Sequence, residues 1–92
     1  MLTIEDIQAM MPDDETILEA MQDRFDSQVP ELTKGIEEEA AARRKDITWT
    51  FHGPNPDLYV DALLKIASEY FKGCMVTTFV RNECLRLNVD WS

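Results

Sequence analysis

A strict alternation of apolar and polar residues near the end of the chain constrains its fold most. Successive side chains of a β-strand point to opposite faces, so an alternating segment predicts a strand with one buried face. The alternating positions in residues 84–91 are Leu85, Arg86, Leu87, Asn88, Val89, Asp90 and Trp91. We therefore expect residues 84–91 to form a strand whose core face carries the apolar members of this set.

A second alternating segment, residues 46–52, predicts another half-buried strand. Its core face carries Ile47, Trp49 and Phe51. A helix over residues 56–72 is expected to follow, with Asn55 as its N-cap, Pro56 at its first position and Gly73 at C′.

Residues 75–80 are predicted as a third strand, whose register against residues 84–91 stays open. A two-residue loop at Asn82 and Glu83 buries the face that carries Val76 and Val80. A three-residue loop buries the opposite face, which carries Met75, Thr77 and Phe79. Asn82 tolerates a positive φ and Glu83 does so poorly, so the sequence favours neither loop.

Helices are expected before the first strand. Thr3 and Asp6 resemble a capping box for a short helix, residues 4–11, which Pro12 ends. Asp13 is expected to cap a helix over residues 14–28. The apolar stripe of that helix is Ile17, Leu18, Met21 and Phe25.

Pro30 leaves two alternatives for the rest of the N-terminal part. It either begins a third helix, residues 31–45, or lies within one long kinked helix. Arg43 is the only base placed four residues after one of the acids Glu37, Glu38 and Glu39, and it would pair with Glu39.

These elements predict a single domain, residues 1–92, with an acidic helical part (1–45) and a β-α-β-β module (46–92). The expected fold class is α+β: a three-stranded, mainly antiparallel sheet packed on helices in two layers. The last strand is expected at the centre of the sheet. The helix over residues 56–72 is expected to cover the face that carries Trp49, Leu87 and Trp91.

Negative charge is concentrated at the start of the chain. The net charge is −9, and residues 1–39 hold twelve of the 18 acidic side chains but two of the nine basic ones. Such a charge argues against direct binding to nucleic acid, because phosphates require cationic side chains. No membrane span or signal peptide is expected, and the two cysteines are expected to be free thiols in a cytoplasmic protein.

Catalytic and metal-binding interpretations are weak in this sequence. His52, Cys74 and Cys84 are three N/S ligands where a zinc site needs four, and the two cysteines are expected far apart along the hairpin. A nucleophilic pair of His52 and Cys84 is formally possible, but no third group or oxyanion hole accompanies it. We therefore expect a protein that is not an enzyme and has no cofactor or metal.

Two functions of different class remain. The first is a non-enzymatic acidic binding protein, in the style of a phage-encoded inhibitor, whose helical surface occupies a basic, nucleic-acid-binding site on a target protein as a DNA or RNA mimic. The second is a structural homo-oligomer whose acidic face serves solubility. The candidate binding residues are Asp13, Asp14, Glu15, Glu19, Asp23, Asp26, Glu31, Glu37, Glu38 and Glu39. A continuous exposed ridge of these acids would favour mimicry.

Overall fold

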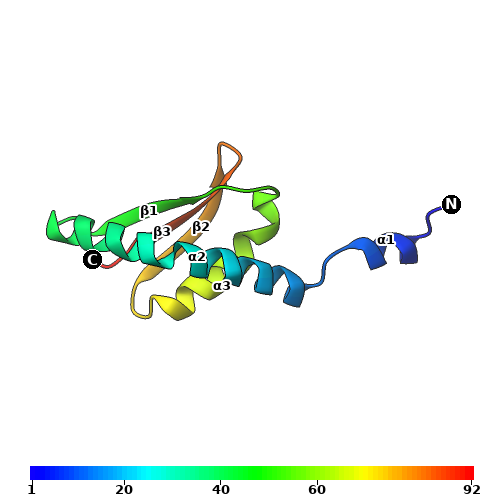
Figure 1. Cartoon of the computed structure of the whole chain (residues 1–92), viewed down its shortest axis with the longest axis horizontal. Helices are drawn as coiled ribbons and strands as arrows, with labels where there is room; N and C mark the ends of the chain where they lie inside the picture. The colour runs from blue at the N-terminus through cyan, green and yellow to red at the C-terminus, as the bar shows by residue number, and fades with distance from the viewer.

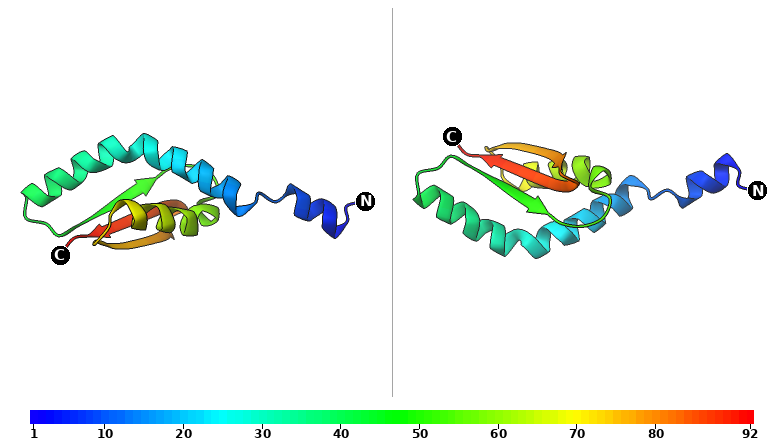
Figure 2. Two further views of the ribbon diagram at one scale, coloured as in Figure 1. Left: turned by 90° about the horizontal axis from the view of Figure 1, so that it is seen from below. Right: turned by 90° about the horizontal axis from the view of Figure 1, so that it is seen from above.

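The structure, a computed structural model, describes all residues 1–92 as an elongated α+β protein of 59 × 25 × 20 Å. Its elements in chain order are α1 (Ile4–Met10), α2 (Asp14–Ala41), β1 (Asp46–Phe51), the 3-10 helix η1 (Pro56–Tyr59), α3 (Val60–Tyr70), β2 (Met75–Arg81) and β3 (Cys84–Asp90). Helices α2 and α3 form one layer and the sheet forms the other, while α1 extends beyond both (Figures 1 and 2).

The sheet has the order β1-β3-β2, and both neighbours of β3 run antiparallel to it. The central, antiparallel position predicted for the last strand is therefore confirmed. Its alternation also takes the expected form, because Leu85, Leu87 and Val89 are fully buried under the helices. The opposite face of the sheet carries the intervening residues and no helix covers it.

The hairpin between β2 and β3 uses the two-residue loop. Arg81 pairs with Cys84, which leaves Asn82 and Glu83 as the loop and puts Val76 and Val80 on the core face. Both loop residues have positive φ angles, 54° and 61°. Glu83 thus adopts a left-handed conformation that its side chain disfavours, because closing this register requires it.

The helix after β1 begins differently from the prediction. Asn55 occupies the N-cap position, with Pro56 following it as predicted, but it has a φ of 54° and its side chain makes no capping hydrogen bond. The chain instead makes the short 3-10 turn η1 before α3 starts at Val60. At the other end, Gly73 has the expected positive φ, 87°, but it lies two residues past the C-cap Phe71, so the expected C′ position was one residue off.

Helix α2 runs through Pro30 without a break, so the N-terminal part after Pro12 is one helix of 28 residues. Pro30 is exposed, on the side of α2 away from the sheet. The proline ring, and the backbone hydrogen bond that proline cannot donate, therefore lie on the solvent side of the helix. Helix α2 arches over the sheet (Figure 2).

The core lies between the two layers and is built from α2, α3 and the sheet. Helix α2 contributes Met21, Phe25 and Leu32, and α3 contributes Leu63, Ile66 and Ala67. Trp49 packs under α2 at Gly35, not under the helix at residues 56–72 as expected. A Cβ added to Gly35 would lie only 3.4 Å from the Trp49 ring, so the absent side chain leaves room for the ring. α2 therefore lies over β1, while α3 lies over β2 and β3.

Helix α1 has its predicted capping box, in which Thr3 and Asp6 exchange hydrogen bonds of 3.1 and 3.2 Å. None of its residues is buried. Its apolar side chains, Ile4, Ile7 and Met10, are exposed. The flanking residues Leu2 and Met11 are exposed as well. This segment therefore projects from the domain as an arm.

Candidate protein-binding surface

The acidic surface starts at a well-defined helix terminus. Asp13 caps α2 as predicted, accepting a hydrogen bond of 2.7 Å from the Thr16 amide. Hydrogen bonding by Thr16, through its side chain first and its backbone second, holds the pKa of Asp13 below its ordinary value of 3.8. Asp14 and Glu15 follow in the first turn, where the helix dipole favours negative charge.

Five acids of α2 form a line that we call the acidic ridge: Glu15, Glu19, Asp23, Asp26 and Glu37. At about 100° per residue, all five fall within an arc of about 80°. The buried residues Met21, Phe25 and Leu32 lie on the opposite side of the helix. The packing of α2 on the sheet thus points the ridge into solvent, and every member of it is exposed.

The other predicted binding residues lie around this ridge. Glu31 and Glu38 are exposed on one flank, rotated by about 60–80° from Asp23. Asp13 and Asp14 lie at the start of the helix, and Asp14 faces α3. The ridge is densest in its first half, because about 16 Å of helix separates Asp26 from Glu37 and Lys34 lies in that interval.

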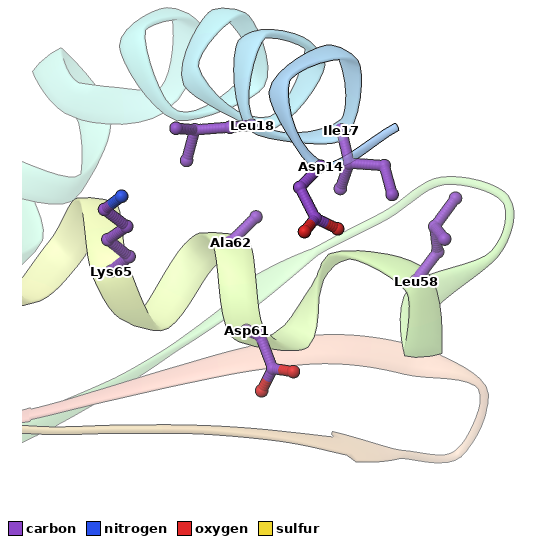
Figure 3. A pocket seen from close by; sticks show the side chains of 7 residues that line it. All are labelled: Asp14, Ile17, Leu18, Leu58, Asp61, Ala62 and Lys65. Atoms are coloured by element: carbon purple, nitrogen blue, oxygen red, sulfur yellow. The ribbon is translucent and has the colours of Figure 1, made fainter. Parts of the chain in front are cut away.

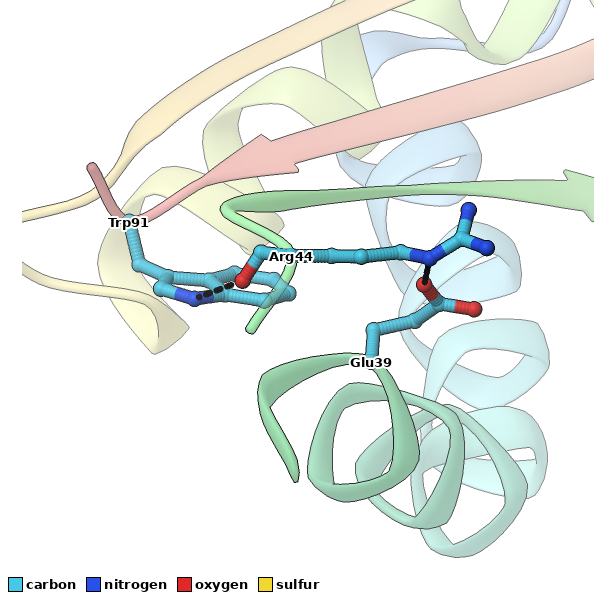
Figure 4. Close-up of polar contacts among 3 residues, drawn as sticks. All are labelled: Glu39, Arg44 and Trp91. Atoms are coloured by element: carbon cyan, nitrogen blue, oxygen red, sulfur yellow. Dashed lines mark hydrogen bonds and ion pairs between the residues drawn. The ribbon is translucent and has the colours of Figure 1, made fainter. Parts of the chain in front are cut away.

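Glu39 is paired, with a different residue from the one predicted. Because α2 ends at Ala41, Arg43 leaves the helix with a φ of 62°. Arg44 instead contacts Glu39, with 3.1 Å between Nε and Oε2 (Figure 4). The Arg44 carbonyl also accepts a hydrogen bond of 3.2 Å from the Trp91 indole, which attaches this end of α2 to the end of β3. The contact between Glu39 and Arg44 is the only ion pair in the structure.

Neighbouring carboxylates of the ridge repel one another. Glu15 and Glu19, and again Glu19 and Asp23, are like charges four residues apart, an arrangement that costs about 0.2–0.5 kcal/mol per pair in a helix. The one polar side-chain contact on the ridge joins Gln22 to Asp26, at 2.8 Å. Packing of Met21 and Phe25 in the core offsets this repulsion and keeps α2 folded.

A groove of 330 Å³ separates the start of α2 from α3 (Figure 3). It is lined by Asp14, Ile17, Leu18, Leu58, Asp61, Ala62 and Lys65. Its polar lining consists of the carboxylates of Asp14 and Asp61 and the amine of Lys65. Its apolar lining comes from Ile17, Leu18, Leu58 and Ala62. The start of α2, which borders the groove, is also where the α1 arm leaves the domain.

The uncovered face of the sheet brings together two residues that the sequence linked only formally. The Cys84 sulfur lies 3.9 Å from Nδ1 of His52. The Arg24 guanidinium donates a 3.0 Å hydrogen bond to the His52 carbonyl, which fixes the end of β1. Both cysteines are free, and Cys74 lies opposite Trp91 at the far end of the hairpin, as the pairing of Met75 with Asp90 requires.

Metal-binding and membrane-spanning features are absent from the structure. No group of three or more histidine, cysteine, aspartate or glutamate side chains is placed to hold a metal ion. None of the helices has both the length and the apolar character needed to cross a membrane.

Known proteins provide no match to compare with this surface. Neither a protein family, nor a curated protein, nor a solved structure matches the chain. Function must therefore be inferred from the residues of the chain itself.

Proposed function

We propose that the protein is a non-enzymatic binding protein whose acidic ridge occupies a basic site on another protein. The observation that carries this proposal is the alignment of Glu15, Glu19, Asp23 and Asp26 along the solvent side of one continuous helix. Solubility alone requires charge but no alignment, and alignment costs helix stability through like-charge repulsion. A cationic partner surface would relieve that repulsion on binding.

The basic site is proposed to be one that normally binds nucleic acid. From Glu15 to Asp26 the ridge carboxylates recur every three or four residues, about 4.5–6 Å along the helix axis. Phosphates of one DNA strand recur about every 3.4 Å of axis, so the ridge supplies a sparser line of charge that a phosphate-binding groove can accept. The curvature of α2, visible in Figure 2, makes this line convex toward the partner.

Affinity capture from a lysate of the host tests this proposal. The immobilised protein is expected to retain nucleic-acid-binding proteins at low salt and to release them as salt rises, because screening weakens contacts between exposed charges. Duplex DNA or RNA, added at constant ionic strength, is expected to displace the same proteins. Capture that is indifferent to both salt and nucleic acid would contradict the proposal.

The α1 arm supports a second candidate, self-assembly. Ile4 and Met10 are 71% and 68% exposed, and no part of the chain covers the apolar stripe that they belong to. Met11 and Asp13, which flank Pro12, are extended, so the arm leads away from the groove of its own chain. We propose that the arm of a second copy occupies this groove, reciprocally, with apolar contact to Leu18 and Leu58.

Charge distinguishes the two candidates. The arm carries Glu5 and Asp6, and the groove carries Asp14 and Asp61 against the single base Lys65, so the net charges of arm and groove are both negative and oppose arm exchange. Added salt screens this repulsion and should strengthen self-association, whereas it should weaken binding through the acidic ridge.

Light scattering over a concentration series, at low and elevated salt, measures self-association. Ile7→Asp places a charge in the apolar stripe and is expected to leave the protein monomeric. Ala9→Asp adds the same charge on the other side of α1 and is the matched control. A monomeric wild-type protein at every concentration would exclude arm exchange.

A further inference from the structure

Cys84 lies in a row of three side chains that crosses the uncovered face of the sheet. Phe51 pairs with Leu85, so His52, the next residue after β1, falls opposite Cys84. On the other side Arg81 of β2 pairs directly with Cys84. Because side chains alternate between faces, all three residues of the His52–Cys84–Arg81 row point away from the helices.

Positive charge surrounds Cys84 in a protein that is otherwise strongly acidic. Arg86 lies two residues along the same strand face, where its guanidinium donates to the Thr50 hydroxyl at 3.1 Å and to the Arg81 carbonyl at 3.4 Å. Glu83 precedes Cys84 in the hairpin loop, and Asp57 lines a hollow together with Glu83 and Gly53 at this end of the sheet. Asp46 and Asp90 share this face but lie at its other end, about 20 Å away along the strands.

Cys74 provides an internal comparison. Both thiols are half-buried, but Cys74 packs against the hydrophobic core with Phe71 and Val76, whereas Cys84 does not belong to the core. No histidine lies within contact of Cys74, while His52 lies 3.9 Å from the Cys84 sulfur. Thiols packed in apolar surroundings are inert, and reactive thiols sit in accessible, electropositive places.

We propose that Cys84 is a thiol–disulfide exchange site that forms a mixed disulfide with small anionic disulfides. In the exchange step, the Cys84 sulfur bonds to one sulfur of the incoming disulfide, whose own S–S bond breaks. The second sulfur leaves as a thiolate, and His52 Nδ1 takes the proton of the Cys84 thiol. Arg81 and Arg86 hold a carboxylate of the incoming molecule next to the sulfur.

Two chromogenic disulfides test the proposal on the full chain: dithiobis(nitrobenzoate), which carries two carboxylates, and neutral dithiodipyridine. The Cys74→Ser variant reports Cys84 alone, and Cys84→Ser reports Cys74 alone. With the anionic probe, Cys84 is expected to react at least about tenfold faster than Cys74. Its advantage is expected to be smaller with the neutral probe and to shrink as salt is added.

Substitutions in the Cys74→Ser background separate the roles of the row. His52→Asn removes the proton acceptor and is expected to slow Cys84 with both probes. Arg81→Gln is expected to slow the anionic probe about threefold, the effect of one unit charge about 6 Å away in water, and to leave the neutral probe unchanged. Arg43→Gln removes an equal charge at the far end of the sheet and is the matched control.

Each outcome decides a part of the proposal. Equal rates at Cys84 and Cys74 with both probes, or a His52→Asn variant as fast as its parent, would overturn the exchange site. Equal effects of Arg81→Gln and Arg43→Gln would overturn its selectivity for anionic disulfides. Unchanged circular dichroism of each variant shows that the rates come from folded protein.

Discussion

Phe25 is the residue that makes the acidic helix part of the same folded unit as the sheet. It is 1% exposed. Its ring stacks on Phe51 of β1 with 6.5 Å between centroids, and meets Tyr70 and Phe71 edge-on at 5.4 and 6.3 Å. Replacing Phe25 therefore perturbs the contacts of α2 with both the sheet and α3.

The Phe25→Ala substitution is expected to lower the free energy of unfolding by about 3–5 kcal/mol, the usual range for removing a buried aromatic ring. A domain of this size has a stability of roughly 5–14 kcal/mol, so this loss is a large fraction of the total. Phe25→Leu keeps most of the apolar volume and loses the aromatic contacts, at an expected cost of about 1–2 kcal/mol.

Urea denaturation measures these losses with two signals. Circular dichroism follows mainly the helices, and tryptophan fluorescence follows Trp49 and Trp91 in and beside the sheet. The two transitions are expected to coincide, in the wild type and in both variants. Asp23→Ala, on the exposed side of the same helix, is the control and should not lower stability, because it removes the repulsion with Glu19 and introduces a better helix former.

The reasoning would be refuted by a Phe25→Ala variant as stable as the Asp23→Ala control. It would be refuted equally by a helical signal that is lost before the fluorescence signal, since that result would make α2 a separate unit resting loosely on the sheet.

Three further predictions follow from local geometry. Because Asn82 and Glu83 both have positive φ, Glu83→Gly should raise the free energy of unfolding by about 1 kcal/mol in urea denaturation, and Glu83→Ala should bring no such gain. Hydrogen bonds from Thr16 to Asp13 and from Ser92 to Asp90 lower the pKa of both carboxyl groups below 3.8 in the folded protein. The stability that these carboxylates contribute is therefore complete above pH 3.8 and is lost as the pH falls through their lowered pKa values. The melting temperatures of the wild type and of Asp90→Asn should converge in acid. The buried Trp49 indole nitrogen has no hydrogen-bond partner, so Trp49→Phe breaks no hydrogen bond. The loss of a hydrogen bond should therefore add to the cost of Trp91→Phe, whose indole donates to the Arg44 carbonyl, and not to the cost of Trp49→Phe; the same urea denaturation measures both.

The elements of this fold could be predicted where one periodic pattern dominates. The alternation around Leu85, Leu87 and Val89 identified the central strand and its buried face, because a one-residue slip would expose all three. Asp13 was identified as a cap because it follows the segment that Pro12 ends and precedes an apolar stripe of helical period. These features depend on neighbours in the sequence.

Other features depend on tertiary contacts and could not be predicted. The hairpin register required a positive φ at Glu83, which local preference disfavours and which the pairing of β2 with β3 imposes. Asn55 occupies the expected N-cap position before Pro56, but its left-handed φ of 54° and the 3-10 turn that follows it could not be predicted from local sequence. The continuity of α2 through Pro30 follows from core packing on both sides of it, at Phe25 and Leu32.

The candidate surface was predicted as a set of acids and not as an arrangement. The structure separates the set into four groups, a division that needed the orientation of α2: the ridge, the flanking Glu31 and Glu38, the paired Glu39, and Asp13 and Asp14 at the start of the helix. The contact between His52 and Cys84, 32 positions apart in the sequence, needed the pairing of β1 with β3.

The most direct test of the acidic ridge compares two variants with equal charge. One replaces the ridge acids Glu15, Glu19, Asp23 and Asp26 with their amides. The other makes the same change at four acids outside α2, Asp57, Asp61, Glu69 and Glu83, so the net charge of both rises by the same amount. Each is immobilised beside the wild type and challenged with host lysate at low salt.

Binding through the ridge predicts that the wild type and the second variant capture the same proteins, and that the ridge variant retains at least about tenfold less of them, since several charge contacts of up to about 1 kcal/mol each are lost. Equal capture by the two variants would contradict the account, because binding would then depend on net charge and not on the alignment of carboxylates along α2.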